Sequence, residues 1–164
     1  MKMAAELFGI TVREGIEGRS LNQHTVEQVC GPLKTTVFLF EGDDGLRVCL
    51  ITSHYLTHFY RFSNLFRKRV AEALDLPFEQ VLSFSSHNHC AVKMVHNQYG
   101  FGRAERDLWL EEKDLTDEGL ELLQRCVEGG LDALEDQAHQ SARIWNTVPK
   151  DTGAAIIELA LSLR

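Results

Sequence analysis

The feature that most constrains the fold is a strand–helix–strand succession in the middle of the chain. Leu46–Thr52 and Gln80–Ser86 have the apolar and small-residue content of buried strands. Between them, Phe59–Leu74 carries apolar residues at helical spacing, and Pro77 follows its end. Two strands that are joined through a helix run parallel in one sheet, with a right-handed crossover. Their carboxyl ends are therefore expected on the same edge of that sheet.

A β-hairpin is predicted directly before this unit. Thr35–Glu41 is rich in β-branched and aromatic residues, and Gly42-Asp43-Asp44-Gly45 has the composition of a turn that leads into Leu46–Thr52. Leu7–Val12 is a candidate first strand. Because the hairpin runs into the β-α-β unit, the sequence predicts one α/β domain over residues 1–164, with a mixed β-sheet flanked by helices.

A second long helix is predicted over Leu115–Ala138. Thr116 can cap it, and acidic residues follow in its first turn. Gly129-Gly130 in its interior costs helix stability and indicates close packing. Its expected buried stripe consists of apolar residues at helical spacing, namely Leu120, Leu123, Val127, Leu134 and Ala138. Beyond it, Ala142–Val148 is a candidate strand, and Gly153–Arg164 fits a strand or a helix.

Composition argues against several classes of protein. A net charge of −7 makes nucleic acid an unexpected partner. No segment approaches the length of a membrane span, and the first residues lack the hydrophobic region of a signal peptide. The four cysteines are scattered without a CxxC pair, so we expect reduced thiols in a cytoplasmic protein. Cys49 and Cys126 are expected in the core, and the sequence leaves open whether the chain forms a homo-oligomer.

Two histidines, His87 and His89, come directly after the second strand of the parallel pair. Residues i and i+2 of an extended segment point the same way, so both imidazoles can converge on one ion. The other parallel strand ends at His54, which brings a third imidazole to the same edge. Imidazole is a common zinc ligand, so the sequence predicts a metal site here, with His96 and Cys90 as reserve ligands. The alternative is that these are polar residues of a surface loop.

Two other segments have alternative interpretations. The long connection Ala91–Asp114 contains Tyr99-Gly100-Phe101-Gly102, which fits a mobile lid over the site or a plain surface loop. The basic run Arg67-Lys68-Arg69 is interpreted as the solvated face of a helix rather than a phosphate site.

Residues from about Leu7 to Ala91 resemble the beginning of the neutral, or alkaline, ceramidase family. That family opens with a short strand and a glycine-containing loop, followed by a strand hairpin similar to residues 32–40 and 46–51. A helix follows, and then a strand that ends in Thr-His-Thr-His-Ser-Gly-Pro, which Ser86-His87-Asn88-His89-Cys90 resembles. Leu115–Ala138 is similar to the family's next helix. The resemblance covers half to two-thirds of the chain.

The resemblance implies a zinc-dependent hydrolase of an amide, with a small molecule or a lipid amide as substrate. The first histidine of the family's motif is a zinc ligand and corresponds to His87. The second lies in the active site near the scissile amide and corresponds to His89. The resemblance thus implies that Zn²⁺ activates a water and polarises the carbonyl, while His89 helps to move protons. His54 remains a candidate for a further ligand.

The sequence also departs from the family pattern. Family members are several times longer, and their remaining zinc ligands lie well beyond position 164. Cys90-Ala91-Val92 replaces the Ser-Gly-Pro, and His54 stands where an Asp usually ends the preceding strand. An Asn-Arg pair that the family carries after the second helix is absent. The site is therefore expected to be incomplete in this chain. The alternatives are a non-catalytic metal- or ligand-binding domain, or a subunit that completes its site with another chain.

Other metal and nucleophile chemistries fit the histidines less well. A metallo-β-lactamase pattern needs Asp-His directly after His-x-His, where this chain has Ala91 and Val92. Amidohydrolases of the TIM-barrel type carry His-x-His on the first strand of a much longer chain. An HNH nuclease spreads its motif over a ββα unit and does not suit an acidic chain. A Cys90–His89 nucleophile pair is disfavoured because neighbours in an extended chain point apart.

Overall fold

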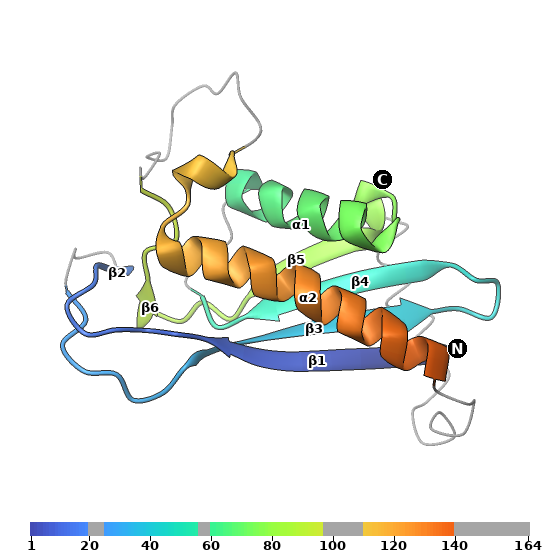
Figure 1. Cartoon of the computed structure of the whole chain (residues 1–164), viewed down its shortest axis with the longest axis horizontal. Helices are drawn as coiled ribbons and strands as arrows, with labels where there is room; N and C mark the ends of the chain where they lie inside the picture. The colour runs from blue at the N-terminus through green and yellow to red at the C-terminus, as the bar shows by residue number, and fades with distance from the viewer. Residues whose placement is uncertain (20–24, 56–59, 97–109, 140–164) are drawn as a thin grey trace.

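A four-stranded mixed sheet, in the order β1-β3-β4-β5, forms the centre of the computed structural model (Figure 1). The structure describes residues 1–19, 25–55, 60–96 and 110–139. Both long helices lie on the same side of the sheet, where they and the sheet enclose the main hydrophobic core. The expected single α/β domain with a mixed sheet and flanking helices is thus confirmed.

The central β-α-β unit has the predicted connectivity. Strand β4 (Arg47–Ser53), helix α1 (Tyr60–Leu74) and strand β5 (Val81–Ser85) follow one another, and β4 pairs with β5 in parallel. Cys49 lies opposite Val81 in this register. A short 3₁₀ turn, η1 (Phe78–Gln80), comes directly before β5. The strand therefore begins one residue later than expected, because Gln80 completes that turn.

The hairpin is also confirmed, and the first strand is longer than predicted. Strand β3 (Leu33–Glu41) pairs antiparallel with β4 and, on its other side, with β1 (Lys2–Ile10). The prediction of Leu7–Val12 was wrong at both ends. The residues before Leu7 include alanine and charged side chains that give little strand signal, yet their backbone pairs along the whole of β3. The partner strand, rather than local propensity, fixes the extent of β1.

Helix α2 (Asp117–His139) is capped by Thr116 as the sequence predicts, and it begins two residues after the expected Leu115. The Thr116 hydroxyl caps it by accepting a hydrogen bond from the Gly119 backbone N–H at 3.2 Å. The expected buried stripe was only partly right: Leu123 is buried, whereas Ala138 is exposed. Small residues form much of the buried face, whose members are Gly119, Leu122, Leu123, Cys126, Gly129, Gly130, Ala133 and Gln137.

The glycine pair of α2 explains why small residues face the core. A Cβ on Gly129 would meet the Phe8 ring of β1 at 3.2 Å, and a Cβ on Gly130 would meet a methyl group of Leu74 in α1 at 3.3 Å. The glycines therefore let α2 approach the sheet and the other helix closely, as their position in the sequence indicated.

Helix α1 packs through its aromatic residues and one arginine. The rings of Phe62 and Phe66 lie 4.4 Å apart between centroids, and both side chains are buried. Arg67 was expected on a solvated face but is half-buried. Its guanidinium donates to the backbone carbonyl oxygens of Val81 and Phe78 and lies 4.0 Å from the centre of the Phe78 ring. Arg67 therefore anchors α1 to the segment that begins β5.

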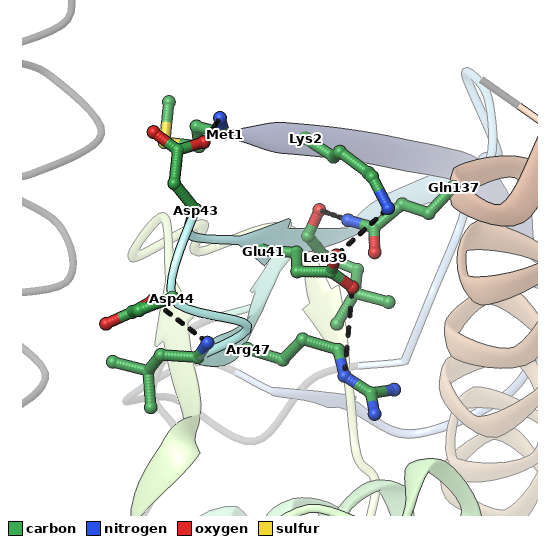
Figure 2. A network of polar contacts seen from close by, with 9 residues as sticks. Met1, Lys2, Leu39, Glu41, Asp43, Asp44, Arg47 and Gln137 are labelled. Atoms are coloured by element: carbon green, nitrogen blue, oxygen red, sulfur yellow. Dashed lines mark hydrogen bonds and ion pairs between the residues drawn. The ribbon is translucent and has the colours of Figure 1, made fainter. Parts of the chain in front are cut away.

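Polar contacts hold the end of the sheet that carries the β3–β4 turn (Figure 2). Lys2 and Arg47, from β1 and β4, both approach the Glu41 carboxylate of β3, at 3.0 Å and 4.0 Å. The Met1 amino group pairs with Asp43 in the turn. The Gln137 side-chain amide of α2 donates to the backbone carbonyl of Leu39. We call this region the hairpin end.

The remaining described elements are short: β2 (Gly18–Arg19) pairs with β6 (Ala91–Val92), and η2 (Glu112–Asp114) precedes α2. Cys49 and Cys126 are buried, and burial raises the pKa of the Cys49 thiol to about 12. All four cysteines are present as thiols.

Neither helix in the described ranges combines the length and the apolar content that crossing a bilayer requires. The candidate strand Ala142–Val148, the ambiguous Gly153–Arg164 and the candidate lid Tyr99-Gly100-Phe101-Gly102 lie outside the described residues.

Candidate metal centre

The carboxyl ends of β4 and β5 lie side by side, as the parallel pairing requires. The ladder continues one step past the strands: the Ser86 N–H donates to the Ser53 carbonyl at 3.0 Å, and the Asn88 N–H donates to the Tyr55 carbonyl at 3.0 Å. This extension carries the segment that contains both histidines of the motif along the end of β4. The site is therefore built on backbone hydrogen bonds to a buried strand.

His87 and His89 are brought together. Their Nε2 atoms lie 3.2 Å apart, and the ring centroids are 4.9 Å apart with an interplanar angle of 83°. Both side chains are exposed. The predicted convergence of these two imidazoles is thus present in the structure.

The two rings meet through a turn rather than through strand alternation. Strand β5 ends at Ser85, and His87 adopts the left-handed backbone conformation, with φ of 58°. Asn88 stabilises the turn that follows, because its side-chain oxygen accepts a hydrogen bond from the Cys90 N–H at 2.9 Å. From the sequence alone, Asn88 was given no role. Asparagine is nevertheless a typical turn residue, because its side-chain oxygen can accept a hydrogen bond from the backbone N–H two residues later.

His54 is not assembled with this pair as a third ligand. Its neighbours Ser53 and Tyr55 are both 4% exposed, whereas His54 is exposed and so points to the opposite side of the strand. Its backbone N–H donates to the Lys34 carbonyl of β3 at 2.8 Å. Across the described residues, no group of three or more His, Cys, Asp or Glu side chains is placed to hold a metal ion.

The separation of the paired ring nitrogens fits two ligands of one zinc ion. Zinc binds histidine nitrogen at about 2.0–2.1 Å in a tetrahedral arrangement, which puts two nitrogen ligands about 3.3 Å apart. The observed Nε2 to Nε2 distance is 3.2 Å. The same distance also suits a hydrogen bond between one neutral imidazole that donates and one that accepts. The described residues thus supply two candidate ligands but no closed coordination shell.

The two residues expected as reserve ligands, His96 and Cys90, have different surroundings from each other. His96 lines a separate cleft of about 330 Å³ beside the start of α2, together with Glu17, Lys93, Asp117 and other residues. The Lys93 ammonium pairs with the Glu17 carboxylate at 2.7 Å across this cleft. Cys90 is exposed and joins no three-membered group of metal-ligating side chains in the described ranges.

The acidic residues of the β3–β4 hairpin do not lie beside the histidines. Glu41, Asp43 and Asp44 belong to the hairpin end, at the opposite end of β4 from His54. No motif places another carboxylate beside the histidine pair, so the sequence offers no assigned general base other than an imidazole.

A comparison of the sequence with protein-family models finds no match. A comparison with curated proteins likewise finds none.

Proposed function

We propose that this chain contributes two imidazoles to the metal centre of an amide hydrolase similar to the neutral ceramidases, with Zn²⁺ as the metal. The observation that carries the proposal is the 3.2 Å separation of the His87 and His89 ring nitrogens at the carboxyl end of a parallel strand pair. Crevices at that position are where open α/β sheets bind ligands. The resemblance supplies the reaction class, and a small-molecule or lipid amide is the proposed substrate.

The two histidines have distinct roles in this proposal. His87 is a ligand, held by the turn that its left-handed backbone creates. His89 is the second ligand or, with its ring turned edge-on to His87, the group that passes a proton to the leaving amine. When bound, zinc would polarise the amide carbonyl and lower the pKa of a water to near 7.

A second function is favoured by the missing ligands. A catalytic zinc site usually has three protein ligands and an open position, and the described residues offer two. The chain would then be a non-catalytic metal- or ligand-binding domain, or a subunit that completes its site with another chain. A homo-oligomer is one way in which that completion could occur.

Hydrolysis and binding can be separated in one experiment. The zinc-loaded chain is incubated with short- and long-acyl N-acyl amides, and release of free amine is followed for the parent, His87→Ala and His89→Ala. The enzyme proposal predicts turnover that both substitutions reduce by at least about 100-fold. If the parent binds zinc without releasing amine, the binding-domain function replaces it. Amine release that persists in both variants would show that other residues do the chemistry.

We further propose that the protein is cytoplasmic. Four thiols without a disulfide support a reducing compartment. Titration of thiols after denaturation, without reductant, is expected to give four per chain. Two or fewer would contradict this placement.

A further inference from the structure

The sheet is apolar on both faces, although α1 and α2 lie on only one of them (Figure 1). Strand alternation and register place one set of side chains on the other face, which we call the outer face. Ala5, Phe38, Leu50 and Leu82 follow one another across the four strands in a single row. The neighbouring rows complete the apolar set of the outer face, which adds Met3, Leu7, Phe40, Val48 and Phe84.

The outer face is buried at one end, where Phe40 is 6% and Val48 is 1% exposed, and open at the other. Val48 and Leu82 form a hydrophobic cluster of their own, with Leu50 packed against it, separate from the main core. At the other end of the face, Leu7 is 62% exposed and Phe84 is 47% exposed. A sheet that is apolar on both faces needs a covering layer on each.

We propose that residues Ala154–Leu163 of this chain cover the outer face. Eight of these ten residues are Ala, Ile or Leu, so the segment can supply an apolar layer over the apolar outer face. The inference is independent of the metal centre and concerns a different face of the sheet.

The point where α2 ends makes this docking feasible. Near the end of α2, Gln137 donates to Leu39 of β3 (Figure 2). In the middle of the helix, Gly129 lies against Phe8 of the edge strand β1. The chain therefore leaves α2 next to that edge of the sheet. Residues 140–153 form a tether of fourteen residues, which spans up to roughly 46 Å when extended. Passing the edge to reach the other face requires a distance on the order of 10–20 Å.

A second copy of the chain is a weaker candidate for the same surface. The four strands lie about 4.8 Å apart and are about 25 Å long on average, which gives an outer face on the order of 500 Å². Two such faces would bury about 1,000 Å² in total, no more than the lower limit of a stable interface. A tethered segment acts at an effective concentration in roughly the millimolar range, well above that of a micromolar protein.

Photo-crosslinking in the full chain tests the proposal. Benzoylphenylalanine replaces Phe84 on the outer face, and in a matched control it replaces Leu131, an apolar residue of α2 that is 44% exposed. After irradiation, we expect the Phe84 position to give a product of monomer mass, joined to the tryptic peptide Asp151–Arg164. The Leu131 position should give at least several-fold less of that product. Leu159→Asp with Leu161→Asp should remove it, whereas Glu158→Gln should retain it.

Three results would overturn the docking. They are a product of dimer mass, a labelled Phe84 position that never joins the 151–164 peptide, and equal joining from both label positions. Circular dichroism establishes that each variant is folded. If the label at Phe84 prevents folding, it moves to Leu7, which is 62% exposed on the same face, with the same expected outcome.

Discussion

The two ends of the sheet use their polar residues in opposite ways. At the hairpin end, Lys2 and Arg47 both pair with Glu41 across three strands, so the carboxylate has its charged partners within the fold (Figure 2). At the end where β4 and β5 finish, which we call the histidine end, His87 and His89 meet each other in exposed positions. The polar groups of the hairpin end thus interact within the fold, whereas the two imidazoles of the histidine end are exposed to solvent.

The two ends of the sheet also differ in backbone conformation. The turn at the hairpin end places a glycine, Gly45, at its positive φ of 81°, where glycine costs nothing. The histidine end places His87 at a φ of 58°, where a residue with a side chain costs on the order of 1 kcal/mol or more. Such an outlier is commonest where a side chain must be aimed. The hairpin end thus has the backbone of a structural turn, and the positive φ of His87 supports the proposal that the histidine end binds a ligand.

The largest effect is expected from His87→Ala. Loss of an outer-shell partner typically weakens metal binding by about 10- to 100-fold, so loss of a direct ligand should weaken it by more than roughly 100-fold. The fold should lose little stability, because the side chain is exposed. Zinc affinity measured by competition with a chelating dye tests this. His54→Ala should have at most a small effect, because His54 is not assembled with the pair, and His139→Ala, at the exposed end of α2, should leave binding unchanged. If His87→Ala binds zinc as tightly as the parent, the histidine end is not the metal centre.

Gly119→Ala should destabilise the support of the histidine end. A Cβ here would lie 2.2 Å from the carbonyl oxygen of Met94, in the segment that follows the histidines, so the backbone must shift. We expect a loss of about 2–3 kcal/mol in the free energy of unfolding, despite the usual gain from alanine in a helix. Gly31→Ala is the matched control, since nothing lies within 4 Å of its added Cβ. Denaturant unfolding compares them, and equal midpoints would refute the close approach.

Gln137→Ala tests the buried polar contact at the hairpin end. The substitution removes the hydrogen bond to the Leu39 carbonyl and leaves a small cavity, so we expect a loss of about 2 kcal/mol. Gln137→Met fills the cavity without the donor and should cost about 1 kcal/mol or less. Zinc affinity should be the same in both variants. An altered zinc affinity would mean that the two ends are coupled.

Glu41→Gln should have the smallest effect. It weakens the paired contacts to Lys2 and Arg47, which are partly exposed and together contribute less than about 1 kcal/mol. Unfolding in low and in high salt tests the cause: the difference from the parent should shrink as salt rises, because screening already weakens the parent's pairs. A difference that stays the same in high salt would point to packing instead of charge.

The fold was more predictable than the site, for a physical reason. The parallel pairing of β4 and β5 follows from local patterns, since two apolar strands and an amphipathic helix admit few arrangements. The extent of β1 and the burial of Arg67 depend on contacts with other elements, so local composition could not reveal them. At the site, the meeting of His87 with His89 was predicted through strand alternation. In the structure, the two rings meet because His87 adopts a left-handed backbone conformation, which the presence of a histidine at this position does not predict.

The position of His54 shows the limit of sequence reasoning most clearly. Parallel connectivity brings it to the correct edge, but the alternation of Ser53 and Tyr55 into the core turns it to the other side. Edge placement is a property of topology, whereas convergence on one ion depends on which side of the strand each side chain occupies. To predict a third ligand, one has to know to which side the His54 side chain points. The spacing of the histidines in the sequence does not give that direction.

The most direct test of the metal centre is a zinc titration of the parent chain followed through its histidine side-chain NMR resonances. The chain has seven histidines, so the spectrum identifies which imidazoles respond. We predict that the resonances of His87 and His89 shift together and reach saturation at one zinc per chain, while those of His139 do not move. If the His87 and His89 resonances remain unchanged at micromolar zinc, or other histidines respond instead, the two-histidine metal centre is contradicted.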